Sequence, residues 1–331
     1  MEPMLSEELK NLEVMGDSAP GRERIQSDMS ILAIVVLYGM SPEVSPTVRT
    51  LLTSAAALTS IERAKFKVLI YDNTPNAHTP GFLGNCFEYH ASAENGGLAS
   101  AYNYALRRAE EEGFEWLLTL DQDTEIHQEY LSKLFELVRQ LHSDDRTAAI
   151  APCIADKGVV ISPHILFYGL SKRFPKGYQG LSRKETAVIN SATAWRVSAV
   201  RDIGGFNPLF WLDYLDYWVC HSIYRSGRRI YVDGNLTISH ELSLLDRKNR
   251  MTAARFDNFL SAETAFYDVY RSRVEGLVLT FRVLGRLLKQ IIRREDLVLR
   301  ALTWSCFKRR LFQPKAMRVD NWRQAMRTFN S

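Results

Sequence analysis

Long apolar runs and closely spaced cysteines are both missing from this chain. No run of about 18 apolar residues exists, so we expect no segment that spans a bilayer. The first 30 residues are polar and acidic and have no apolar core, which argues against a signal peptide. The four cysteines are far apart and form no C-x-x-C pair, and they are Cys86, Cys153, Cys220 and Cys306. This usage is typical of buried thiols in a reducing compartment, so we expect a cytoplasmic protein.

Negative charge is scarce in the last part of the chain. Residues 271–331 contain 15 Lys and Arg but only 4 Asp and Glu, whereas the whole chain has a net charge of +4. The first 270 residues therefore carry −7 and the remainder +11. A basic end on an acidic body favours an anionic partner, which could be a membrane, a nucleic acid or an acidic protein.

Strands and helices alternate in the first half of the chain. Continuous apolar, β-branched runs such as Ile31–Tyr38 are typical of parallel strands buried on both faces. We expect strands at 31–38, 67–71, 87–90 and 116–121, with helices at 46–59 and 98–112. This alternation predicts an open, doubly wound α/β sheet with right-handed crossovers.

The second half has a mixed pattern without a repeat of fixed period. We expect helices at 127–141 and 213–226, strands at 148–154, 229–232 and 236–240, and a broken strand at 186–197. The Gly- and Pro-containing segment from Val159 to Lys184 is expected to be mainly loop. From Thr252 onward the whole pattern is helical. We therefore expect three parts: a flexible leader over 1–30, an α/β domain over 31–245 and a helical region over 246–331.

Two carboxylates follow the buried strand that starts at Trp116. Asp121 ends this strand, and Asp123 follows one residue later. The carboxyl ends of strands in an open α/β sheet border the ligand crevice. Two hard oxygen donors there suit Mg²⁺ or Mn²⁺, which keep several waters and bind substrate phosphates. The alternative is an acidic turn in which Asp123 or Thr124 caps the next helix.

Polar residues also follow the second strand and precede the next helix. Asp72 and Asn73 could bind the base or ribose of a nucleotide, or could form an Asx turn with their own backbone. In the loop that follows, Asn95 and Gly96 lie at a helix N-terminus, which favours negative charge. Asn103 on that helix could face the same crevice, and the alternative is a solvated side chain.

A second acidic pair lies in an aromatic segment. Asp213 and Asp216 are spaced i, i+3 and are expected on one face of a helix. A carboxylate near a second acid or an apolar wall can have a raised pKa and act as a general base. The aromatic residues around the pair could stack on sugar rings or fill the core, and they are Trp211, Tyr214, Tyr217 and Trp218. His240 ends the last expected strand and could bind a metal or a phosphate.

The order of these pieces resembles family 2 glycosyltransferases of the GT-A fold. The pieces are the strand ending in Asp72-Asn73, ENGGLASAYN, LDQDT, GGFNPLFWLDYLDYWVC and His240. LDQDT and the aspartate-aromatic run resemble the bacterial rhamnosyltransferase branch. The resemblance covers about 31–240 and implies an open, twisted mixed sheet flanked by helices.

The resemblance also implies an inverting transfer from a nucleotide-sugar donor, with dTDP-rhamnose favoured and a UDP-sugar possible. The acceptor would be a glycan or a lipid-linked saccharide in cell-surface polysaccharide synthesis. By motif position, Asp72 would contact the base, Asp121 and Asp123 the metal and diphosphate, and His240 the same metal. Asp216 matches the catalytic base, while Trp211, Asp213, Tyr217 and Trp218 would face the acceptor.

Some positions depart from the family pattern. Trp218 stands where another acidic residue is usual, the segment 190–193 lacks a common Gly, and His221-Ser222 replaces Leu-Arg. A nucleotidyltransferase of the same fold and a catalytically inactive membrane scaffold therefore remain alternatives.

The basic end contains an amphipathic helix between 274 and 294. One face is apolar and another is basic, with Arg282, Arg286, Lys289 and Arg293 spaced i, i+4, i+7 and i+11. The basic face could bind the inner leaflet of the cell membrane, or the helix could pack on the domain with its charged face in solvent. We expect an anionic membrane and not nucleic acid as partner, and a homo-oligomer is possible.

Overall fold

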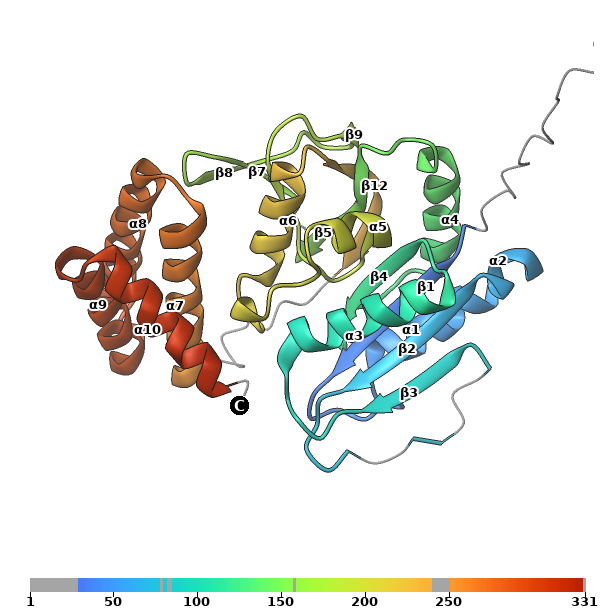
Figure 1. Cartoon of the computed structure of the whole chain (residues 1–331), viewed down its shortest axis with the longest axis horizontal. Helices are drawn as coiled ribbons and strands as arrows, with labels where there is room; N and C mark the ends of the chain where they lie inside the picture. Colours follow the sequence, from blue (N-terminus) through green and yellow to red (C-terminus); the bar gives the residue numbers. More distant parts are fainter. Residues whose placement is uncertain (1–28, 78–79, 82–84, 157–158, 240–250, 330–331) are drawn as a thin grey trace, which may run out of the picture.

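The computed structural model describes residues 29–77, 80–81, 85–156, 159–239 and 251–329. Most of the expected leader, His240 and the boundary at 245 lie outside the described residues. The mixed α/β architecture that we expected is confirmed (Figure 1). A nine-stranded sheet has the order β3-β2-β1-β4-β11-β5-β12-β9, with β6 paired to β5.

The first four strands are parallel and form one half of the sheet. They are β1 (Ile31–Leu37), β2 (Phe66–Asp72), β3 (Phe87–Ala91) and β4 (Trp116–Asp121). Alternate residues of β1 enter two separate cores: Ile34 packs with α3 (Gly97–Glu112), and Val35 packs with α1 (Pro46–Ala56) and α4 (Tyr130–Leu141). Coverage of both faces explains why these strands are continuous apolar runs. A short helix, α2 (Ser60–Ala64), precedes β2.

The other half of the sheet mixes directions. β11 (Thr193–Arg196) is antiparallel to both β4 and β5 (Thr147–Asp156), while β12 (Arg229–Ser239) is parallel to β5. β12 is one strand with a register shift between Asp233 and Thr237, where we expected two strands.

The expectation of a loop over 159–184 is wrong. This segment contains β6 (Val159–Ser162), β7 (His164–Phe167), β8 (Leu170–Arg173) and β9 (Gln179–Leu181), and β7 and β8 form a second sheet with β10 (Thr186–Ala187). These strands are three or four residues long, and β8 is exposed throughout, so they lack the alternating pattern that identifies a half-buried strand.

Four helices follow the sheet at one end of the molecule (Figure 1). They are α7 (Ala253–Tyr270), α8 (Arg273–Ile292), α9 (Leu297–Phe312) and α10 (Lys315–Phe329). Leu260 and Phe266 of α7 belong to the same core as Phe210 and Tyr214 of the sheet domain. Among the described residues, we find no helix with the length and apolarity needed to cross a bilayer.

Candidate active site

The turn after β4 holds Asp121 and Asp123 at the carboxyl edge of the sheet. Asp121 pairs with Val36 of β1, and Asp72 of β2 pairs with Leu37, so the two aspartates end strands on the same edge. The backbone N–H of Asp121 donates to Ser191 Oγ at 3.0 Å. The hydroxyls of Thr47, in the first turn of α1, and of Ser45, just before α1, donate to the carbonyls of Asp121 and Gln122 respectively. Neighbouring segments therefore fix the turn, and both carboxylates remain partly exposed.

These two carboxylates suit a divalent cation that retains water. Mg²⁺ and Mn²⁺ are commonly held by one or two carboxylates together with substrate phosphates. Within the described residues, no three His, Cys, Asp or Glu side chains are placed to hold a metal ion together. A cation bound here would therefore depend on Asp121, Asp123, water and a phosphate ligand, while His240 lies outside the described residues.

Asp72 and Asn73 are almost fully buried below this edge. Asp72 is 3% exposed; its Oδ1 accepts from the Thr74 N–H at 2.9 Å and its Oδ2 from the Tyr89 hydroxyl at 2.8 Å. The first of these contacts is the local turn that we considered as the alternative. Asn73 Nδ2 donates to the Gly97 carbonyl at 3.3 Å, and its buried Oδ1 has no partner among the described residues. Donor contact by these two residues stays a prediction.

The glycine loop packs against the aromatic segment. Asn95 and Gly96 are half-buried at the start of α3. Gly97, the second glycine of this loop, has φ +70°, and a Cβ there would overlap Trp211. The Ala99 N–H donates to the Trp211 carbonyl at 3.1 Å, so this close approach joins the start of α3 to the aromatic segment.

The expectation that Asn103 faces the donor is wrong. Its Nδ2 donates to the Phe206 carbonyl at 2.6 Å, and its Oδ1 accepts from the Phe206 N–H at 2.8 Å. Both ends of the amide therefore bind the backbone of one residue. This pairing holds the aromatic segment on α3, which is a structural role.

Asp216 lies in the first turn of α6 (Leu215–Arg225), where the charge of Asp121 affects its pKa. The pKa of Asp216 is raised to about 7, mainly by burial, and the charges of Asp213 and Asp121 add to this rise. The Tyr217 N–H donates to Asp216 Oδ1 at 2.8 Å and opposes the rise. Burial and the charges of Asp121 and Asp216 also raise the pKa of Tyr102. Tyr102 on α3 has a buried hydroxyl without a partner among the described residues. Tyr102 belongs to the ENGGLASAYN motif, but nothing in the sequence around it distinguishes it from an ordinary core tyrosine.

The expectation that Asp213 and Asp216 lie on one helix face is wrong. Tyr214 has φ +65°, so α6 begins at Leu215 and Asp213 precedes it. Asp213 accepts from Arg255 Nη2 at 2.9 Å and from Asn258 Nδ2 at 2.6 Å. Burial raises the pKa of Asp213 despite these two partners. Arg255 and Asn258 belong to α7, and the helical pattern of that segment did not distinguish them.

The aromatic side chains divide into buried and partly exposed residues. Trp218 is buried within the main core, so its expected role in acceptor binding is wrong. Trp211 is partly exposed and donates from Nε1 to Asn258 Oδ1 at 3.3 Å. Tyr217 is also partly exposed and stacks on Tyr214 with ring centroids 4.8 Å apart.

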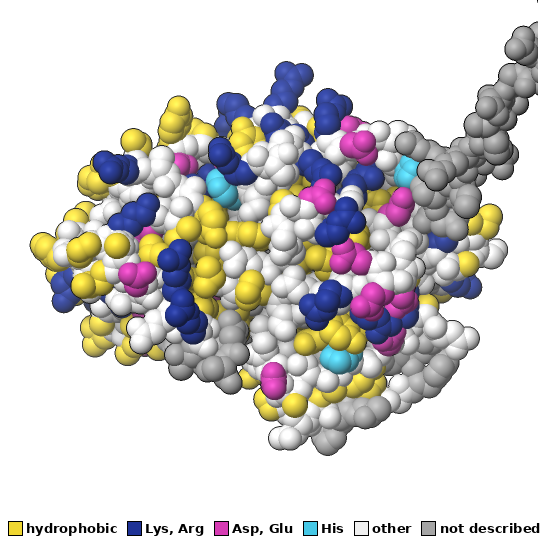
Figure 2. All heavy atoms as spheres, in the orientation of Figure 1, with side chains coloured by type: hydrophobic (Ala, Val, Ile, Leu, Met, Phe, Trp, Pro, Cys, Tyr) yellow, Lys and Arg dark blue, Asp and Glu magenta, His cyan; other side chains and the backbone are white. Residues whose placement is uncertain are grey.

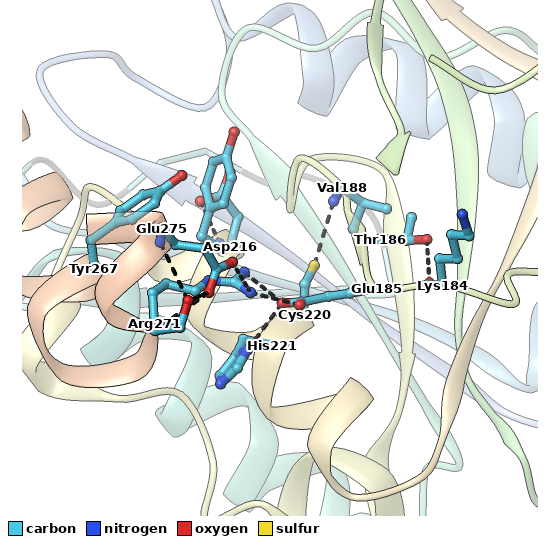
Figure 3. A network of polar contacts seen from close by, with 12 residues as sticks. Lys184, Glu185, Thr186, Val188, Asp216, Cys220, His221, Tyr267, Arg271 and Glu275 are labelled. Atoms are coloured by element: carbon cyan, nitrogen blue, oxygen red, sulfur yellow. Dashed lines mark hydrogen bonds and ion pairs between the residues drawn. The ribbon is translucent and has the colours of Figure 1, made fainter. Parts of the chain in front are cut away.

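His221 of α6 and Arg271, which follows α7, both contact Glu185, so ion pairs link α6 to the C-terminal helices (Figure 3). Arg271, after α7, donates to both carboxylate oxygens of Glu185, and His221 Nδ1 lies 3.0 Å from Glu185 Oε1. Burial opposes ionisation of Glu185, but contacts with His221 and Arg271 hold its pKa below the usual value. His221 is one of the departures from the family pattern, and here it serves this network.

Comparisons with known proteins agree with this arrangement. The family description Glycosyl transferase family 2 matches residues 33–204, which is more than half of the chain. The dTDP-rhamnosyl transferase RfbF of Shigella flexneri is 23% identical over 219 residues, covering 64% of this chain and 69% of that protein.

Solved structures add a likeness in fold. The crystal structure of GalNAc-T7 with UDP, GalNAc and Mn²⁺ matches with a TM-score of 0.50 and 13% identity, over 72% of this chain and 50% of that one. Staphylococcus aureus TarS 1–349 matches with a TM-score of 0.46 and 15% identity, over 91% of each chain. The mixed sheet with flanking helices is that of GT-A glycosyltransferases. The chain belongs to glycosyl transferase family 2.

Proposed function

We propose that this chain is an inverting, metal-dependent glycosyltransferase. It transfers a sugar from a nucleotide-diphosphate donor to a glycan or lipid-linked saccharide in cell-surface polysaccharide synthesis. The observation that carries the proposal is the proximity of Asp216, whose pKa is raised, to Asp121 at the end of β4. A base and a diphosphate site in one cleft are what a displacement at an anomeric carbon requires. The likeness to RfbF supports dTDP-rhamnose as donor over a UDP-sugar.

In the proposed reaction Asp216 accepts the proton of an acceptor hydroxyl. The acceptor oxygen forms a bond to the anomeric carbon as the bond to the donor diphosphate breaks, so the configuration inverts. Asp121 and Asp123, with His240 as a proposed further ligand, would hold a Mg²⁺ or Mn²⁺ ion, which would supply positive charge for the leaving diphosphate. Trp211 and Tyr217 offer aromatic faces to the acceptor sugar.

We assign the remaining roles on the same basis. Asp72, Asn73, Asn95 and Gly96 border the donor side, and Asp213 positions the acceptor side through Arg255 and Asn258. The α/β part over 31–245 and the helical part over 246–331 thus both contribute to the site. A lipid-linked acceptor would require a cytoplasmic enzyme to work at the inner face of the cell membrane.

Donor binding should be detectable as a rise in thermal stability. A panel of nucleotide sugars with Mn²⁺ should reveal one donor that stabilises the fold, because a ligand at 100 times its Kd adds about 2.7 kcal/mol. Asp123→Ala should keep the apo melting temperature of the wild type and lose the Mn²⁺-dependent part of the shift. Glu125→Ala, an exposed acid two residues further on, is the control.

The product separates the proposal from its alternatives. Turnover of the stabilising donor with an acceptor should release a nucleoside diphosphate. Release of pyrophosphate from a triphosphate would identify a nucleotidyltransferase, and donor binding without any product would identify an inactive scaffold.

The acid limb of the pH–rate profile should report Asp216. Transfer requires the ionised carboxylate, so kcat/KM should rise with pH and level off above a pKa at or below about 7. A bound cation near Asp121 would lower this value. Asp213→Asn removes one neighbouring negative charge and should move the limb to lower pH at the same metal concentration. A limb that is unchanged in Asp213→Asn and near pH 4 in both proteins would contradict this assignment.

A further inference from the structure

α8 has two apolar sides: one, with Leu279 and Val283, is buried in the core, and the other faces solvent. Six of its side chains are between 48% and 81% exposed, and they are Val274, Leu277, Phe281, Leu288, Ile291 and Ile292. We call these six residues the exposed apolar face. Figure 2 shows hydrophobic side chains over the end of the molecule that the C-terminal helices form, with Lys and Arg among them. A helix on a soluble domain normally buries such a face, so this orientation needs a cause.

Core packing of Leu279 and Val283 and a buried charge on α7 together fix the orientation of α8. Glu263 is 1% exposed, and both terminal nitrogens of Arg286 bind its carboxylate, at 2.8 and 3.1 Å. Arg282 donates to the Tyr267 hydroxyl at 2.9 Å and to the Gly169 carbonyl at 3.1 Å. Rotating α8 to bury the exposed apolar face would expose Leu279 and Val283 and would leave Glu263 without Arg286. The expectation that Arg282 and Arg286 face an anionic surface is therefore wrong, since both bind the protein.

The apolar surface continues beyond the end of α8. Leu297 and Val298, at the start of α9, are 73% and 52% exposed. Further along α9, Lys308 Nζ lies 5.7 Å from the ring centre of the exposed Trp304. Tryptophan beside a cation is typical of the boundary between apolar chains and water in a bilayer.

The charge around the exposed apolar face distinguishes between two possible partners, a second copy of the chain and an anionic lipid surface. The face has the three-and-four spacing of a coiled-coil seam, so a second copy of the chain is one candidate. However, Lys289, Arg293 and Arg294 are exposed, and no acidic side chain lies within ion-pair distance of them in the part of the chain that the structure describes. Residues 271–331 carry +11, so two copies would bring strongly basic surfaces together, whereas anionic lipid would be attracted.

We propose that α8 lies on an anionic lipid bilayer. The exposed apolar face contacts the acyl chains, and the basic residues at the C-terminal end of α8 lie at the headgroups. The helices lie on the membrane instead of crossing it. Docking gives the enzyme access to a lipid-linked acceptor under the proposed function, but binding itself needs neither donor nor acceptor.

Flotation of the full chain with vesicles tests the proposal without any substrate. Wild type should bind vesicles of equimolar phosphatidylcholine and phosphatidylglycerol. The fourfold variant Leu277→Gln, Phe281→Gln, Leu288→Gln, Ile292→Gln should partition about 100-fold more weakly, because it removes the apolar contacts. Lys289→Gln, Arg293→Gln and Arg294→Gln should each weaken binding about fivefold, which corresponds to about 1 kcal/mol per basic residue.

Val44→Gln with Ile61→Gln is the matched control, because both side chains are exposed but lie outside the face. This control should bind as wild type does. If the fourfold variant does not fold, Phe281→Gln with Ile292→Gln replaces it. The proposal is overturned if wild type does not bind or if the variant binds equally well. A dimer in the absence of lipid that the same substitutions dissociate, together with no vesicle binding, would assign the face to a second copy.

Discussion

Replacing Asp216 by Asn should lower the rate of sugar transfer about 10²–10⁴-fold, which is the range for loss of a positioned general base. The amide keeps the shape of the side chain and can still accept from the Tyr217 N–H. It cannot accept the proton of an acceptor hydroxyl. Donor binding, measured by thermal shift with Mn²⁺, should change little, because the diphosphate is assigned to Asp121 and Asp123.

The stability of this variant separates a chemical role from a structural one. Burial makes the ionised Asp216 costly, as its raised pKa shows. Asp216→Asn removes that cost, so at pH 8 the variant should melt at the same temperature as wild type or higher. A loss of activity without a loss of stability is expected of a base.

Asp213→Asn is the matched control for the neighbouring carboxylate. Asp213 is already bound by Arg255 and Asn258, so its replacement should reduce transfer less than tenfold. If Asp213→Asn were inactive while Asp216→Asn retained activity, the catalytic carboxylate would be Asp213.

The parallel half of the sheet could be predicted because its strands are buried on both faces. Ile31–Leu37 and Trp116–Asp121 are continuous apolar runs, and only this environment favours them. The two carboxylates after β4 could be identified for the same reason, since polar residues that end such a strand reach the crevice. The strands of 159–184 are too short for their pattern to be distinguished from a loop.

The acceptor side could be predicted only in part, because its contacts are distant in the sequence. The left-handed backbone at Tyr214 separates Asp213 from α6, and helical spacing gives no sign of it. Arg255 and Asn258 reach Asp213 from 42 and 45 residues away. Trp218 and Tyr217 are adjacent aromatics, and only the packing of α6 decides that Trp218 enters the core.

Helical periodicity defines the two faces of α8 but not which of them meets the protein. That choice depends on the burial of Leu279 and Val283 and on Glu263 of α7. Glu263 accepts from the Tyr214 hydroxyl at 2.9 Å as well as from Arg286. Glu263 thus joins α8 and the segment before Asp216 through one buried carboxylate. A buried acid that binds a guanidinium from another helix can outweigh the burial of apolar side chains, because an unpaired charge is far costlier.

Replacing Glu263 by Ala should therefore destabilise the protein strongly. Removing one partner of a buried ion pair costs about 3–5 kcal/mol, and the partial exposure of Arg286 places the expected loss near 3 kcal/mol. Urea unfolding followed by tryptophan fluorescence measures this change. Glu129→Ala, which breaks an exposed pair with Lys133, should leave the free energy of unfolding close to that of wild type.

A double variant tests whether the unpaired charge is the cause of this loss. Combining Glu263→Leu with Arg286→Met removes both charges and keeps similar volumes, so it should recover most of the stability lost in Glu263→Ala. Recovery would show that the pair sets the orientation of α8 more than it adds stability. A Glu263→Ala protein as stable as wild type would mean that contacts other than this carboxylate hold the basic side of α8 against α7, and the exposure of its apolar face would then need another cause.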